Sequence, residues 1–121
     1  MTPTRILVTD RPKRLRAAVH SAVTGEPDLE LVDVSGDEIE MLMLVAEAHA
    51  DLVVMAMTAR TLPPLAERLL DENPQLVVLA LDLDQAEGLL HRVWPDTTLI
   101  QDLSADGLTA VLRRAATGHA R

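Results

Sequence analysis

The spacing of apolar residues alternates along the chain between short continuous runs and a helical period. Short apolar runs bounded by polar or turn-forming residues predict five buried strands, at residues 5–9, 29–34, 52–57, 76–81 and 97–101. Apolar residues at three- and four-residue spacing predict five helices, at residues 13–23, 38–49, 64–72, 84–93 and 105–117. The run at 52–57 is apolar throughout, which is typical of a strand covered on both faces.

Strands and helices that alternate in this way predict an α/β fold with right-handed crossovers. Five such units predict a five-stranded doubly wound parallel sheet with the flavodoxin-like order 2-1-3-4-5 and helices on both faces. No repeat or linker divides the chain, so residues 1–121 are predicted to form a single domain. Sites in such folds lie at the carboxyl ends of the strands. In this sequence these ends are Thr9-Asp10-Arg11, Ala56-Met57, Ala80-Leu81 and Gln101-Asp102.

The charge balance of the chain restricts its partners. The formal net charge is −8, which argues against direct nucleic-acid binding because that binding depends on Lys and Arg neutralising phosphates. Five basic residues nevertheless fall in the first sixteen positions, which indicates either a solvated first helical turn or a patch for an anion or acidic partner. No apolar stretch is long enough for a membrane span, and no signal peptide is recognised. We therefore expect a cytoplasmic protein.

Residue types that carry common enzyme chemistry are absent or scattered. There is no cysteine, which excludes disulfides and thiolate sites. The four histidines form no pair at metal-ligand spacing. No glycine-rich loop follows the first strand, which disfavours NAD, FMN and nucleoside triphosphates. We expect no cofactor and no enzymatic activity, because a fold alone does not imply a reaction.

With the strand ends in place, the chain resembles the receiver domains of two-component response regulators. The matching segments are Leu15-Arg16-Ala17-Ala18-Val19, Glu26-Pro27-Asp28-Leu29-Glu30-Leu31-Val32, Ala50-Asp51-Leu52-Val53-Val54 and Leu99-Ile100-Gln101-Asp102-Leu103-Ser104. The resemblance is to the subfamily with a helix-turn-helix output domain, and it covers essentially the whole chain. It implies that the output domain would begin near Arg121, so we expect this chain to hold the receiver-like domain alone.

A working receiver uses an acidic pair after strand 1 for Mg²⁺ and an Asp after strand 3 as phosphoryl acceptor. It also uses a hydroxyl after strand 4, and an aromatic switch residue and a Lys on strand 5. The corresponding positions here are Asp10, Arg11, Ala56, Ala80, Thr98 and Gln101. One acid is thus replaced by a cation, and the acceptor and hydroxyl positions both hold alanine. The aromatic position holds threonine, and the lysine position holds glutamine.

We call these six positions the degenerate site, and their replacements change its charge. Three acids and one Lys give a usual receiver site a charge of about −2, which attracts Mg²⁺. Asp10 and Arg11 cancel here, so the site sums to about zero and we expect neither Mg²⁺ nor phosphorylation. Asp10 could pair with Arg11, Arg60 or nearby backbone, or could bind a ligand. Arg11 and Arg60 could hold a phosphate or carboxylate beside the first helix, or could form a solvated rim.

We expect a signalling or dimerisation module that binds a protein partner or a second copy without phosphorylation. Helix 38–49 is more apolar than one buried face requires. If Ile39, Leu42, Val45 and Ala46 face the sheet, Met41, Leu44 and Ala48 form either a docking patch or a wider buried surface. The resemblance implies self-association through the first and last helices, at Val19, Leu112 and Ala116 among others. The alternative function is a small-ligand sensor that uses the vacated pocket.

Overall fold

The structure, a computed structural model, describes residues 3–9, 12–35, 37–57, 60–91, 98–101 and 105–119. Within these segments it places every side chain except those of residues 33–35, 38, 98–99, 101, 105–106, 114 and 116–119. The strands are β1 (Thr4–Thr9), β2 (Leu29–Ser35), β3 (Leu52–Ala56), β4 (Val77–Asp82), β5 (Glu87–His91) and β6 (Thr98–Gln101). The helices are α1 (Lys13–Val23), α2 (Glu38–Ala48), α3 (Pro64–Glu72) and α4 (Ala105–His119).

The described strands form one sheet in the order β2-β1-β3-β4-β5-β6. Neighbours among β1 to β4 pair in parallel, which confirms an α/β fold with a mostly parallel sheet. Strand β5 runs antiparallel to both β4 and β6. The predicted strand order 2-1-3-4-5 is found along the sheet, but the fifth strand is formed by residues 87–91. The strand predicted at 97–101 is the sixth strand, β6, next to β5. The prediction of five strands, all parallel, was therefore wrong.

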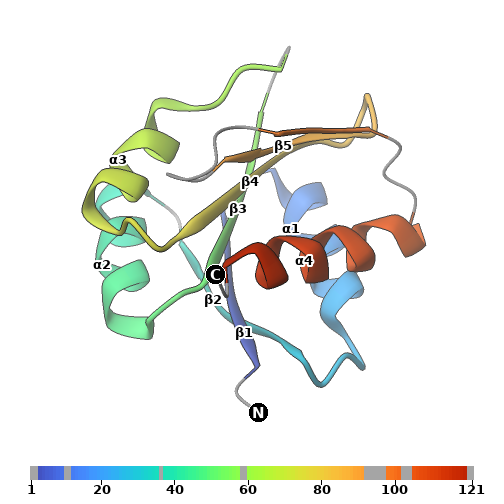
Figure 1. Ribbon diagram of the computed structural model, residues 1–121, viewed down its shortest axis with the longest axis horizontal. Coiled ribbons are helices and arrows are strands. Elements are labelled where there is room, and N and C mark those ends of the chain that lie inside the picture. The colour runs from blue at the N-terminus through green and yellow to red at the C-terminus, as the bar shows by residue number, and fades with distance from the viewer. Residues whose placement is uncertain are drawn as a thin grey trace.

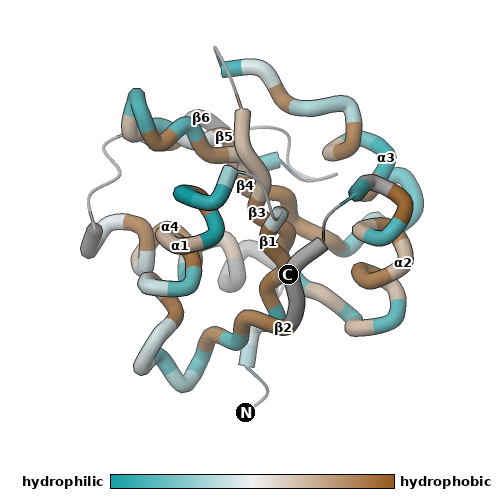
Figure 2. Tube along the Cα trace, turned by 180° about the vertical axis from the view of Figure 1, so that it is seen from behind, coloured by the Kyte–Doolittle hydropathy of each residue, from teal (hydrophilic) through white to brown (hydrophobic). Residues whose placement is uncertain are grey.

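Helices cover both faces of the sheet, as predicted (Figure 1). Helices α1 and α4 pack on the face that carries Ile6 and Val8 of β1. Helices α2 and α3 pack on the opposite face, which carries Leu7 of the same strand. All three of these side chains are fully buried, and the central strands are hydrophobic along most of their length (Figure 2). The alternation of side chains along a strand thus divides the interior into two cores, one on each face.

The helix predicted at residues 84–93 was wrong, because residues 84–91 form a turn and then β5, and residues 92 and 93 lie outside the described residues. Leu89 belongs to the core beneath α2 and α3, whereas Leu90 belongs to the core beneath α1 and α4. Consecutive residues reach opposite faces only in an extended strand, since neighbours on a helix lie about 100° apart. Gly88 also disfavours a helix. Its position leaves little room, because a Cβ there would lie 2.8 Å from Leu81 Cδ2 and 3.2 Å from the Ala80 carbonyl oxygen.

The turn between β4 and β5 is organised by a short-range side-chain contact. The Asp82 carboxylate oxygen Oδ1 accepts hydrogen bonds from the backbone N–H groups of Asp84 (3.1 Å) and Gln85 (3.2 Å). Aspartate commonly closes turns in this way. Ala86 completes the reversal with a positive φ of 52°, in the left-handed region. The local chemistry of Asp82 and Gly88 therefore favours a hairpin over a helical turn.

Helix α4 is held against α1 and the α1–β2 connection by polar contacts as well as by packing. The Thr109 hydroxyl donates to the carbonyl of Ala22 at 3.1 Å. Arg113 donates from Nε to Asp28 Oδ2 at 2.8 Å and from Nη2 to Glu26 Oε1 at 2.6 Å. The hydrogen bond from Arg113 lowers the pKa of the Asp28 carboxyl. A lowered carboxyl pKa stabilises the fold above the usual pKa and loses that contribution as the pH falls through the lowered value.

Candidate functional site

Near the carboxyl ends of β3 and β4, the positions where a receiver would hold its acceptor and hydroxyl carry the methyl side chains of Ala56 and Ala80. The last residue of β4, Asp82, is acidic, and its carboxylate caps the turn that follows. Ala56 is the last residue of β3 and pairs with Leu81 of β4. Ala80 is fully buried in the core beneath α2 and α3. Met57 follows β3, is also buried, and donates its backbone N–H to the Leu81 carbonyl at 3.0 Å. The side chains of these four apolar residues supply neither a nucleophile nor an oxygen ligand for Mg²⁺ at this part of the sheet edge.

The other degenerate-site positions are described in part. Asp10 and Arg11 lie outside the described residues. The backbone of Thr98 pairs with Leu90, and the backbone of Gln101 pairs with Glu87, both across β5 and β6. Because β5 lies between β4 and β6, the structure does not bring Gln101 beside Ala80 on a neighbouring strand. The position that matches the receiver lysine is thus separated from the β3–β4 edge by an additional strand.

Arg60, predicted as half of an anion-binding rim, is paired with Glu87 at the start of β5. Its Nε donates to Glu87 Oε1 at 3.1 Å, and Nη2 forms an ion pair with Oε2. This bidentate pair raises the pKa of the Arg60 guanidinium, first through the hydrogen bond and then through the charge of Glu87. The Glu87 side chain is only 15% exposed. The Arg60 charge is therefore largely balanced within the chain, and sequence reasoning missed Glu87 because it placed that residue in a helix.

A second ion pair joins the β4–β5 turn to α1. Arg14, in the first turn of α1, contacts the Asp84 carboxylate. Both side chains are well exposed, so this pair contributes at most about 1 kcal/mol to stability. Together with Arg60 and Glu87, it ties the hairpin to α1 on one side and to the β3–α3 connection on the other. The hairpin therefore lies next to the carboxyl edge of the parallel strands.

Three residues predicted to form an interaction surface are buried instead. Met41 is 1% exposed, and Val19 and Leu112 are fully buried. Val19 and Leu112 pack in the core that α1 and α4 share with the sheet. Leu44 and Ala48 are half-buried, and the side chain of Ala116 lies outside the described set. The prediction that Val19 and Leu112 lie on the surface was therefore wrong, and of the two readings offered for Met41 the structure agrees with burial and not with a docking patch.

The error in α2 has a simple physical cause. Its sequence is apolar on nearly every side, so the helical period alone does not select the face that meets the sheet. The structure buries Met41 and Val45, which are four residues apart, against the sheet. Ile39 and Met43 are left 71% and 56% exposed, although Ile39 was predicted to face inward. An exposed apolar pair does exist on α2, but it lies on a different face from the one predicted.

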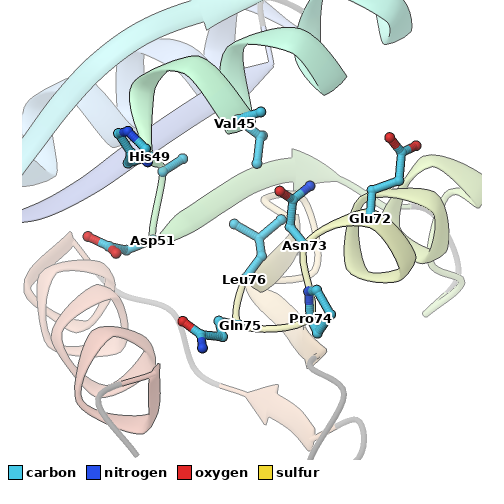
Figure 3. A pocket seen from close by; sticks show the side chains of 10 residues that line it. Val45, His49, Asp51, Glu72, Asn73, Pro74, Gln75 and Leu76 are labelled. Atoms are coloured by element: carbon cyan, nitrogen blue, oxygen red, sulfur yellow. The ribbon is translucent and has the colours of Figure 1, made fainter.

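A cavity of about 440 Å³ lies at the opposite, amino-terminal edge of β3 and β4 (Figure 3). It is lined by the last turns of α2 and α3 and by the chain that follows each of them. His49, Asp51 and Glu72 supply its ionisable groups, with Asp51 and Glu72 on opposite sides. Asp51 Oδ2 accepts a hydrogen bond from the backbone N–H of Arg5 at 3.0 Å. Sequence reasoning did not identify this cavity, because it searched the carboxyl ends of the strands.

Among the residues that the structure describes, no group of three or more His, Cys, Asp or Glu side chains could hold a metal ion. None of the described helices is long and apolar enough to cross a membrane.

Comparison with known proteins gives no relative from which a function could be transferred. No family model, no curated protein and no solved structure matches the chain.

Proposed function

We propose that this chain is a receiver-like domain that works without phosphorylation, as an interaction or self-association module in cytoplasmic signalling or transcriptional regulation. The observation that carries the proposal is that four residues near the carboxyl ends of β3 and β4 have apolar side chains, namely Ala56, Met57, Ala80 and Leu81. Phosphoryl transfer needs a nucleophile, and its product needs cationic or hydroxyl partners. Because these positions hold neither an acid nor a hydroxyl, the domain is regulated by the binding of a partner to its surface and not by phosphorylation.

The arrangement of the strands and helices supports the same proposal. The parallel strands β1 to β4 with α1, α2 and α3 correspond to the first part of a doubly wound flavodoxin-like domain. The β4–β5 hairpin then takes the place of the helix that such a domain carries next. Two ion pairs, Arg60 with Glu87 and Arg14 with Asp84, hold that hairpin beside the former site. We infer one fixed conformation, because a switch needs a ligand that favours a second state.

Chemical-shift mapping tests this proposal. We expect the amide spectrum to remain unchanged when Mg²⁺ and then beryllofluoride, a phosphoryl analogue, are added. An authentic receiver in the same buffer serves as the positive control and should show large shifts. Saturable shifts near Ala56 and Ala80 would show that the site still binds metal and phosphoryl groups, and would contradict the proposal.

A small-ligand sensor is the second candidate. The observation in its favour is the 440 Å³ cavity, which has the size of many ligand sites. This cavity lies at the amino-terminal edge of the sheet, away from the vacated pocket that the sequence suggested. Screening metabolites for a saturable rise in Tm would separate this candidate from the interaction module.

A further inference from the structure

Helices α1 and α2 carry opposite charges on one chain. Helix α1 contains Lys13, Arg14 and Arg16 and no acidic residue. Helix α2 contains Glu38, Glu40 and Glu47 and no Lys or Arg. The whole chain has a formal net charge of −8, so two copies repel each other unless opposite charges meet locally. Among the side chains that the structure describes, α1 therefore exposes basic groups and α2 exposes carboxylates.

The acidic helix α2 also carries the exposed apolar side chains. Ile39 and Met43 are the large hydrophobic residues that are exposed within the described part of the chain. They are four residues apart and therefore neighbours on the helix surface. The exposed residues Glu40 and Glu47 lie three positions before and four positions after Met43. The outer side of α2 is thus an apolar pair flanked by carboxylates, which we call the α2 ridge (Ile39, Glu40, Met43 and Glu47).

The basic helix α1 borders a groove of about 370 Å³ that it forms with β2. Lys13, Arg16 and His20 line this groove from α1, and Ala17 and Leu31 supply its apolar part. We call these five residues the α1 groove. A cavity of about 150 Å³ already accommodates benzene, so the α1 groove has room for aliphatic side chains. Its positive border and apolar floor match the composition of the α2 ridge.

The ridge and the groove lie on opposite faces of the sheet, so one copy cannot fill its own groove. Helix α1 packs on one face and α2 on the other. Both helices contact β2, the strand at one end of the described sheet. A two-fold axis along the direction of β2 exchanges the two faces and brings α1 of each copy beside α2 of the other. Such an arrangement forms two identical ridge-to-groove contacts and closes at two copies.

We propose that a second copy of this chain occupies the α1 groove, with Ile39 and Met43 of its α2 ridge on Ala17 and Leu31 and its carboxylates facing Lys13. This inference rests on the proposed function and names the partner. Burial of the apolar pair supplies the affinity, and the opposite charges set which helices meet. Arg14 contributes less because it already contacts Asp84 within its own chain.

Sedimentation velocity over a range of concentrations tests the contact. We expect the full chain to form a dimer, and Met43→Glu and Lys13→Glu each to raise its dissociation constant about tenfold or more. Ala110→Glu on α4 is the matched control for Met43→Glu, because it adds the same single negative charge at an exposed position on another helix. Lys13→Arg, which keeps the charge, should also leave the dimer intact. Thermal melts at a dilution where the wild-type chain is monomeric establish that each variant is folded, because dimerisation itself raises the Tm.

Mixing the two disruptive variants gives the sharper result. The mixed dimer has one intact contact, between the ridge of the Lys13→Glu chain and the groove of the Met43→Glu chain, and one contact that carries both substitutions. Each variant's own dimer has both contacts impaired, so the heterodimer should be tighter than either variant alone when one substitution is enough to break a contact. A monomeric wild-type chain, assembly beyond two copies, no effect of Lys13→Glu, or no recovery on mixing would each overturn the inference. None of these results bears on phosphorylation, because the spectra with Mg²⁺ and beryllofluoride test that separately.

Discussion

Replacing Leu112 by Ala is expected to lower the free energy of unfolding by about 3 kcal/mol. Leu112 is fully buried in α4, where it packs in the core that α1 and α4 share with the sheet. Truncation removes buried methyl groups and leaves a cavity that the surrounding helices fill only in part. A domain of this size has a total stability of about 5–15 kcal/mol, so the loss is readily measured by urea denaturation.

Ile39→Ala is the matched control for this experiment, because it truncates an aliphatic side chain that is 71% exposed. Measured at a dilution where the chain is monomeric, it should change stability by no more than about 0.5 kcal/mol. If Leu112→Ala altered the oligomeric state and left stability unchanged, Leu112 would be an interface residue, as the sequence had suggested, and the packing of α4 would be wrong.

The second large effect is expected at Gly88, where valine should lower the free energy of unfolding by about 2 kcal/mol. A Cβ at this position would lie 2.8 Å from Leu81 Cδ2 and 3.2 Å from the Ala80 carbonyl oxygen. Leu81 is 1% exposed and has little room to move, and the carbonyl oxygen belongs to the central part of the sheet. The two γ-carbons of valine add to this crowding. Urea denaturation measures the change.

Alanine at the same position distinguishes a strand from a helix by the sign of its effect. If residues 84–93 were helical, Gly88→Ala would stabilise the chain by about 1 kcal/mol. In β5 the added Cβ is crowded, so we expect Gly88→Ala to destabilise the chain, though less than valine does. Gln85→Ala, at an exposed position in the turn, is the control and should be close to neutral. A stabilising alanine would contradict the hairpin.

The contrast between helices α1 and α2 shows what a helical pattern can and cannot predict. The apolar residues of α1 leave a clear polar side, and the predicted range 13–23 agrees with the observed helix. In α2 nearly every position between Ile39 and Ala46 is apolar, so several faces fit the same period. The choice of Met41 and Val45 as the buried pair depends on the sheet surface beneath them, which the helix sequence alone does not specify.

Residues 84–93 show a different limit. The pair Leu89-Leu90 suits a buried helix or a strand equally well at this length. The deciding features are non-local, since Gly88 packs against β4 and Glu87 pairs with Arg60, 27 residues earlier. The same limit applies to predicting the candidate site from the sequence. The sequence alone shows that Ala56 and Ala80 lack reactive groups. The ion pair that balances the charge of Arg60 depends on Glu87 of β5, a strand that the local sequence pattern does not predict.

The claim that this domain works without phosphorylation is tested most directly by intact mass spectrometry after incubation with acetyl phosphate and Mg²⁺. An authentic receiver treated in parallel should gain the mass of one phosphoryl group. We predict that this chain keeps its unmodified mass, because the resemblance to receivers places Ala56 at the acceptor position and Ala80 at the hydroxyl position. A phosphoryl adduct that maps to Asp82, the last residue of β4, or to Asp10, which follows Thr9 in the sequence, would contradict the account.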